Sequence, residues 1–182
     1  MSKDELVIRH LTEKTVTLPA LLDENDGDAS FRQLLHNIFA FSSKIEAIRA
    51  EFGKILGLTG IEYTALIATA YMRNKGTVYV NSLADHLHLS GAFITLQTNK
   101  LAKKGYLTKT KDPQDARRVQ LDLTKQGYEA LSSLSHSQQQ VNDVLFAGLD
   151  QAHFQALSEA FGLLANNGDR AFSLASFLSN NK

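Results

Sequence analysis

The chain has 182 residues, 43% of them hydrophobic and 21% charged, and no apolar run approaches the roughly 18 to 20 residues that span a bilayer. It contains no cysteine, which excludes disulfide bonds, thiolate metal sites and cysteine nucleophiles. The net charge is zero, but residues 1–30 carry three cations and seven anions, whereas residues 90–118 carry seven cations and two anions. Because the local field decides what a surface attracts, residues 90–118 are either a binding site for an anion or a solvated lysine-rich face.

Residues 1–30 have the composition of an acidic extension. Their first ten residues include acids where a secretory signal peptide would be basic and then apolar, so we expect a cytoplasmic protein. The segments LVIRHL (6–11) and LPALL (18–22) are each compatible with a short helix or an extended arm. DENDGD (23–28) offers no apolar side chain to bury, which predicts a solvated linker or cap.

Two helices are predicted next. Apolar residues recur at three- and four-residue spacing from Phe31 to Ile55, which indicates a long amphipathic helix with Ser30 as its N-cap. Thr59 and Glu62 have the spacing of a capping box and begin a second helix, which ends before Gly76.

A short strand and two further helices follow. TVYV (77–80) is rich in β-branched and aromatic residues, and the compact helix after it has Asn81 or Ser82 as its cap. Ser90 caps the next helix, residues 91–104. Helical periodicity places Ile94, Thr98 and Leu101 on the inward face, and Ala92, Thr95, Leu96, Asn99 and Lys103 on the opposite face.

The remaining sequence predicts a hairpin and two long helices. YLTKTK (106–111) and RVQLDLT (118–124) alternate as strands do, and the turn residues Asp112 and Pro113 lie between them. Thr124 then caps a helix over about residues 125–147. Asp150 caps a last helix, which either continues or breaks near residues 166–168.

The predicted fold is therefore mainly α with a small β-hairpin, and residues 58–124 form a winged helix-turn-helix domain. Such a domain suits duplex DNA, because a helix about 10–12 Å in diameter fits the major groove of about 12 Å. A cationic hairpin tip, residues 111–118, then meets the negative potential of the minor groove. This gives Arg117 and Arg118 a function that a simple turn would not require.

Over about residues 31–165 the sequence resembles the MarR family of transcriptional regulators. The residues that carry the resemblance are Leu58-Thr59, Leu83-Ala84, Leu87, Leu89-Ser90, Ile94-Thr95, Leu101, Lys104-Gly105-Tyr106, Asp112-Pro113, Asp115, Arg117, Leu123-Thr124 and Gly127. The chain departs from the family at Leu96 and Ala116, where arginine is frequent, and each departure removes a cation from the expected DNA face.

The resemblance implies a homodimer on a pseudo-palindromic operator. Residues 31–57 and 125–178 would form the dimerisation region, and Asp115 would hold Arg117 in an ion pair that shapes the wing. The resemblance also implies modulation by a small, commonly aromatic ligand. The expected DNA-binding residues are Ser90, Thr95, Leu96, Asn99, Lys100, Lys103, Arg117 and Arg118.

Other functions find less support. The sequence lacks the short motifs of hydrolase nucleophiles, phosphate loops and zinc helices, so we expect no enzyme activity, no catalytic residues, no cofactor and no metal site. One alternative is a winged-helix scaffold that has lost DNA binding and serves protein interaction or ligand sensing, which Leu96, Ala116 and the acidic residues 1–30 favour. The acidic residues 1–30 are also compatible with folding over the basic face as a DNA mimic.

Overall fold

The computed structural model of the chain describes residues 13–181. These residues form helices and one three-stranded antiparallel sheet, in agreement with the predicted fold class. The chain divides into two compact units, of which the first ends at Ser133 and the second begins at Leu134. Among the described residues no single helix is long and apolar enough to cross a membrane. Only α2 and α3 taken together pass that test, and they are bent by 90° at their junction.

The first unit opens with a 3₁₀ turn, η1 (Pro19–Leu21), and helix α2 (Ala29–Ile55). The prediction of Ser30 as N-cap was wrong, because Asp28 holds that position and its carbonyl accepts from Arg32 N. Asp28 is also buried rather than solvated, since its carboxylate accepts from Thr15 N, Thr15 Oγ1 and Arg32 Nε at 2.6 to 2.8 Å. The prediction for residues 6–11 lies outside the described residues.

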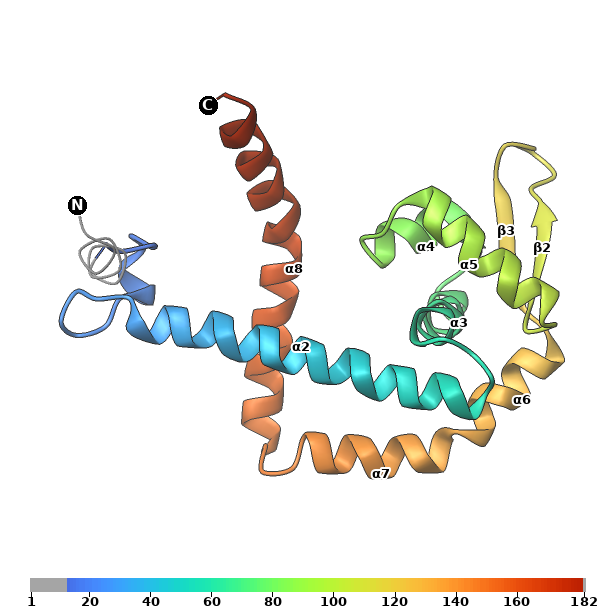
Figure 1. The fold of residues 1–182 in the computed structure, drawn as a ribbon, viewed down its shortest axis with the longest axis horizontal. Coiled ribbons are helices and arrows are strands. Elements are labelled where there is room, and N and C mark those ends of the chain that lie inside the picture. Colours follow the sequence, from blue (N-terminus) through green and yellow to red (C-terminus); the bar gives the residue numbers. More distant parts are fainter. Residues whose placement is uncertain (1–12, 182) are drawn as a thin grey trace, which may run out of the picture. The chain divides into compact units, whose positions relative to one another are not determined.

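Helix α3 (Gly60–Arg73) confirms the predicted capping box. Thr59 Oγ1 accepts from Glu62 N at 3.3 Å, and Glu62 Oε2 accepts from Thr59 N at 2.8 Å. At the other end of α3, Arg73 donates to both carboxylate oxygens of Asp122 at 3.0 and 2.9 Å. These two hydrogen bonds join α3 to β3, and Figure 1 shows α3 near the carboxyl end of α2.

Strand β1 (Val78–Tyr79), helix α4 (Val80–His86) and helix α5 (Gly91–Lys103) follow in the predicted order. Helix α4 begins earlier than predicted, with Tyr79 rather than Asn81 or Ser82 at the N-cap. Ser82 still serves the helix start, because its hydroxyl accepts from Tyr79 N and donates to Tyr79 O. Ser90 caps α5 as predicted and accepts from Phe93 N at 3.2 Å.

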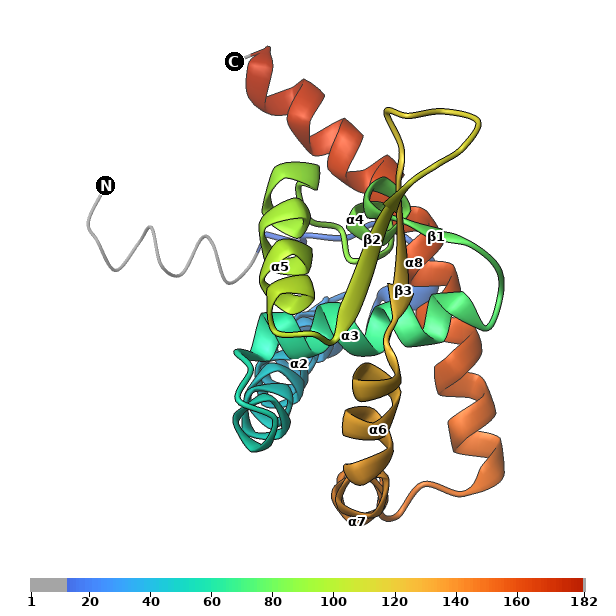
Figure 2. The ribbon, with the colours of Figure 1, turned by 90° about the vertical axis from the view of Figure 1, so that its right-hand side faces the viewer.

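The sheet has the strand order β1–β3–β2, with β2 (Leu107–Lys111) and β3 (Val119–Leu123) forming the predicted hairpin. Figure 2 shows this hairpin running alongside α5, with its loop projecting beyond α4 and α5. The core under both elements consists of fully buried side chains from α3, α4, α5 and the sheet. They include Tyr63, Leu66, Val78, Leu83, Ile94, Thr98, Leu101 and Leu121.

Helix α6 (Lys125–Ser133) closes the first unit, and Thr124 caps it as predicted by accepting from Gly127 N at 3.0 Å. The prediction of one helix over residues 125–147 was wrong, because α6 ends at Ser133 and α7 (Ser135–Leu145) begins after Leu134. Ser133 Oγ donates to Ala130 O, a side-chain contact that competes with the helical backbone bonds at this break.

The second unit contains α7 and α8 (Gln151–Asn180), which continues without a break through residues 166–168. Asp150 is its N-cap as predicted and accepts from His153 N at 2.8 Å. Within residues 135–145 and 151–180, the structure buries no side chain of α7 or α8. The exposed apolar residues of α8 include Phe154, Leu157, Phe161, Leu163, Leu164, Phe172, Leu174, Phe177 and Leu178.

Candidate nucleic-acid interface

Helix α5 presents a mixed polar and apolar face to solvent. Thr95, Leu96, Asn99, Lys100 and Lys103 are all exposed there, and they come from one side of the helix. The opposite side is buried, as predicted for Ile94, Thr98 and Leu101. Gln97 is buried with them, which the periodicity had not indicated.

Two hydroxyl groups on α5 are already engaged with its own backbone. Ser90 Oγ accepts from Phe93 N, and Thr95 Oγ1 donates to Gly91 O at 2.7 Å. The Thr95 proton is therefore used within the helix, and its oxygen lone pairs remain to accept from a partner. The side chain of Lys104, by contrast, contacts the start of α3 and the turn before it. Its Nζ donates to Gly57 O at 2.9 Å and to Glu62 Oε2 at 3.0 Å.

Glu62 lies below this lysine and is buried. Its burial acts to raise the pKa of the carboxyl group, but hydrogen bonds from Thr59 N and Lys104 outweigh burial. The net pKa of Glu62 is lowered, so the carboxylate stays charged and holds the start of α3 against the end of α5.

The wing is organised by Asp112 at its base. Asp112 is buried, and its carboxylate accepts from Tyr79 Oη and Gln120 Nε2, each at 2.7 Å. It also accepts from the backbone N–H groups of Gln114 and Asp115, each at 2.9 Å. These donors, Tyr79 first, hold the pKa of Asp112 well below its usual range, and the same bond raises the pKa of Tyr79.

The two wing arginines have different surroundings. Arg117 has a side chain that is 92% exposed, and its Nε lies 3.2 Å from Asp115 Oδ1, the ion pair that the family resemblance implied. Arg118 instead lies over the ring of Tyr79, with Cζ 3.6 Å from the ring centroid. The wing thus extends one guanidinium into solvent and holds the other against β1.

A hollow of about 320 Å³ separates the amino end of α4, the middle of α5 and the wing. Its lining includes three cations, Lys109, Arg117 and Arg118, and one anion, Asp85, so positive charge predominates on this concave surface. A phosphate backbone is the kind of partner that such a surface attracts.

Lys109 on β2 also lies on this surface, although the sequence pattern did not indicate it as a binding residue. Its Nζ donates to Thr98 Oγ1 at 2.9 Å and to Asn99 Oδ1 at 2.7 Å, which connects the wing to α5. Desolvation by burial lowers the pKa of Lys109. Its place on the face of β2 that points to α5 is the signal that could have identified it.

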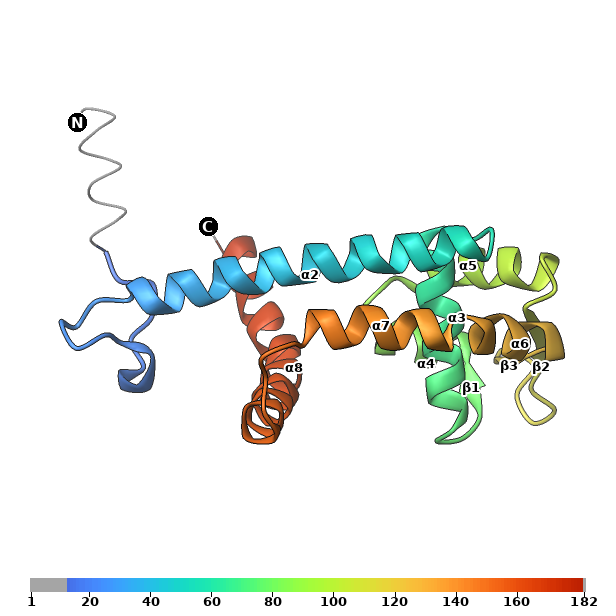
Figure 3. The same cartoon turned by 90° about the horizontal axis from the view of Figure 1, so that it is seen from below.

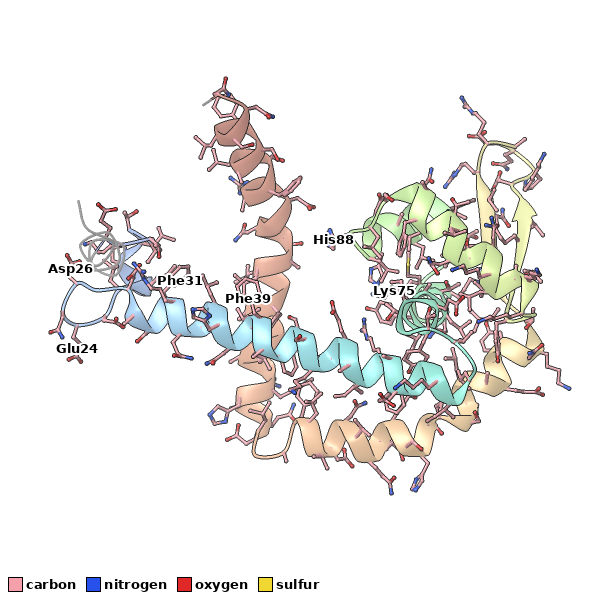
Figure 4. All side chains as sticks on the ribbon, viewed as in Figure 1. Glu24, Asp26, Phe31, Phe39, Lys75 and His88 are labelled. Carbon is pink, nitrogen blue, oxygen red and sulfur yellow. The ribbon has the colours of Figure 1, made fainter. Side chains whose placement is uncertain are left out.

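The acidic segment before α2 lies away from this surface. Figure 3 shows α2 as one uninterrupted helix with the winged elements at its carboxyl end. Figure 4 shows Glu24 and Asp26 on the loop at the other end of α2, far from Lys75 on the winged side. Helix α2, which has 27 residues and is about 40 Å long, lies between residues 13–28 and the winged elements of the same protomer.

Among residues 13–181, no three histidine, aspartate or glutamate side chains come together in a group that could hold a metal ion.

Comparison with known proteins gives consistent matches. A model of the MarR family matches residues 71–119. The HTH-type transcriptional regulator SarZ of Staphylococcus saprophyticus is 28% identical over 131 residues, which cover 72% of this chain and 87% of that protein. A MarR protein from Peptoclostridium difficile has a TM-score of 0.66 at 21% identity, covering 87% of this chain and 97% of that one. A mutant MarR from E. coli, solved in complex with operator DNA, has a TM-score of 0.62 at 18% identity, covering 74% and 95%.

The fold and its basic surface define a DNA-binding winged helix-turn-helix protein. The helix order, the hairpin and the cations on α5 and the wing all contribute to that class. The chain resembles the MarR family, because a model of that family matches residues 71–119 and the SarZ relatives and MarR structures share its sequence pattern and fold.

Proposed function

We propose that the protein is a dimeric regulator that binds a pseudo-palindromic operator, with α5 in the major groove and the wing in the minor groove. The observation that carries this proposal is the convergence of Lys109, Arg117 and Arg118 beside the exposed face of α5. A major-groove helix flanked by a cationic wing can contact base edges and phosphates of the same duplex segment.

Within this proposal the eight predicted residues have different roles. Thr95, Leu96 and Asn99 face the base edges, and Leu96 would contact a thymine methyl group because apolar side chains recognise that feature. Ser90, Lys100 and Lys103 would contact phosphates. Arg117 would enter the minor groove, and Arg118 would remain on Tyr79 and support the wing.

The proposed homodimer is supported by apolar surface that the protomer leaves exposed. In α2 only Phe52 and Gly53 are buried, while Phe39 is 69% exposed. Helix α8 adds Phe154, Phe161 and Phe172, each at least 42% exposed. Two long helices with this much apolar surface suit an interface with a second copy, which would place two winged domains about 34 Å apart on DNA.

A second hollow, of about 490 Å³, supports the proposal that a small aromatic ligand modulates the protein. Ile61, Leu87, Leu89 and Phe93 provide apolar lining, and Glu46 and Arg49 from α2 add one anion and one cation. A hollow of this size, mostly apolar with a few polar groups, suits a small aromatic ligand. Because the hollow touches α2, α3 and the α4–α5 turn, a ligand that prefers one arrangement of these elements would change DNA affinity. We also propose that the protein acts in the cytoplasm, where its operator would be found.

The test is a mobility-shift titration with the duplex upstream of the gene for this protein, with and without hydroxybenzoates. If six to ten phosphates are contacted, affinity falls about 10³–10⁵-fold between roughly 50 and 200 mM salt. Binding that does not respond to salt contradicts the proposal. The scaffold alternative is supported by the exposed apolar side chains of Phe93 and Leu96. A stable dimer that shifts no duplex would favour that alternative.

A further inference from the structure

The side-chain amide of Asn99 is held by a cation from another element. Lys109 Nζ, on β2, lies 2.7 Å from Asn99 Oδ1 and 2.9 Å from Thr98 Oγ1. Thr98 is buried and its hydroxyl donates to Ile94 O at 2.9 Å, so it can only accept from the lysine. Lys109 is therefore fixed between one buried and one exposed acceptor of the same helix.

This contact decides which end of the Asn99 amide faces outward. An ammonium group has three donors and no acceptor, so the amide atom that meets it must be the carbonyl oxygen. The –NH₂ group then occupies the other side of an exposed side chain. Asn99 consequently offers two N–H donors to a partner, while one lone pair of its oxygen is already in use.

Base recognition depends on that orientation. An asparagine that pairs with adenine in the major groove uses its oxygen to accept from N6 and its –NH₂ to donate to N7. Lys109 competes for that oxygen, and its positive charge repels the amino group of adenine. Guanine instead presents two acceptors, N7 and O6, at the same edge. A donor-only pair formed by Lys109 and Asn99 matches guanine.

We infer that Lys109 is a positioning residue that orients Asn99 as a hydrogen-bond donor, so that α5 selects guanine over adenine where Asn99 meets the operator. The inference rests on the proposed function, because it requires α5 to lie in the major groove. The inference extends the proposed function, because it names the base that Asn99 selects and the residue that imposes the choice.

The experiment selects bound duplexes from a library randomised around the operator, using the full chain and four variants. Lys109→Met removes the donor, Lys109→Arg keeps a group with donors only, Asn99→Ala removes the contact, and Lys111→Met removes a neighbouring exposed cation of β2 as the control. Circular dichroism checks that each variant is folded.

The wild type should prefer guanine over adenine about tenfold or more at one position of each half-site, since one good bidentate pair discriminates to about that extent. Lys109→Met and Asn99→Ala should each reduce that preference to about twofold or less, and Lys109→Arg should keep it. Lys111→Met should weaken binding to all duplexes equally and leave the selected sequence unchanged.

The inference is overturned if Lys109→Met keeps the guanine preference, or if the wild type selects adenine at the position that Asn99→Ala alters. If Lys109→Met or Asn99→Ala does not fold, the affinities of the wild type and Lys109→Arg are measured for operators that carry guanine or adenine at that position. Equal affinities for the two operators would also overturn the inference. If the wild type shifts no duplex, the proposed function itself fails and this inference falls with it.

Discussion

The guanidinium of Arg118 lies on the ring of Tyr79, with Cζ 3.6 Å from the ring centroid, while the hydroxyl of the same tyrosine donates to Asp112. One aromatic residue of β1 thus contacts both the base of the wing and its second arginine. The wing is therefore positioned from outside the hairpin, by the strand that precedes α4.

The first prediction separates the two contacts of Tyr79. Tyr79→Phe keeps the ring under Arg118 and removes the hydrogen bond to Asp112, whereas Tyr79→Leu removes both. We expect each variant to bind DNA less tightly than the wild type. The affinity of Tyr79→Leu should be roughly twofold to fivefold lower than that of Tyr79→Phe, because an exposed cation–π contact usually contributes that much. Fluorescence anisotropy at one salt concentration measures both. Equal affinities for the two variants would show that the stack on Arg118 does not contribute.

A second prediction concerns Arg117, the more exposed of the two wing arginines. Arg117→Ala should weaken DNA binding. It should also reduce the magnitude of the slope of log affinity against log salt concentration by about one, because one cation that neutralises DNA phosphate charge is lost. The control is Lys125→Ala at the start of α6, which removes an exposed cation at the end of the hairpin away from its loop. An unchanged slope for Arg117→Ala, matching the control, would place Arg117 outside the DNA contact.

The third prediction is a pH dependence that follows from Glu62. Because the folded state lowers the pKa of this carboxyl group below its usual 4.5, the folded state binds fewer protons than the unfolded state near that pH. The stabilisation by Glu62 is present above about pH 4.5 and is lost as the pH falls through the lowered value. The urea midpoint of the wild type should therefore fall more steeply, as the pH drops below about 4.5, than that of Glu62→Gln.

Glu159→Gln on the exposed face of α8 is the matched control for this charge loss. It should keep the acid sensitivity of the wild type. A Glu62→Gln protein with the same acid profile as the wild type would refute the role of the buried pair with Lys104.

Gly127 gives the fourth prediction, on stability. A Cβ atom at this position would lie 2.3 Å from Tyr106 O, a backbone atom that cannot move aside easily. We expect Gly127→Ala to destabilise the protein by about 1–3 kcal/mol, the usual cost of overpacking, with a corresponding fall in Tm. Gly162→Ala on α8 meets no atom within 4 Å and should leave Tm unchanged or raise it, since alanine favours helix. Thermal unfolding followed by circular dichroism compares the two.

The fifth prediction tests the dimer. A charge in a buried apolar interface is costly, so Phe39→Glu on α2 and Phe161→Glu on α8 should each shift the protein toward monomer. Thr77→Glu, in an exposed turn before β1, should not. Sedimentation velocity at several concentrations distinguishes the states, and a wild type that sediments as a monomer throughout would exclude the proposed interface.

Several local features were predictable from the sequence, because short-range chemistry determines them. The capping box of Thr59 and Glu62 needs only three residues of spacing, and the caps at Ser90 and Asp150 follow the same rule. Alternation around a turn at Asp112 and Pro113 was enough to predict the hairpin. The sequence alone therefore determined the winged-helix order, the exposed face of α5 and the resemblance to the MarR family.

Only the tertiary structure decided which side chains meet across elements. Periodicity gives the face on which Lys109 or Asn99 lies, but the contact between them depends on how β2 packs against α5. The burial of Gln97, the central place of Asp112 and the stack of Arg118 on Tyr79 have the same origin. Each joins residues through packing of separate elements, and neither spacing nor composition encodes that geometry. The orientation of the Asn99 amide, and with it the inferred choice of base, is a consequence of the fold rather than of any motif.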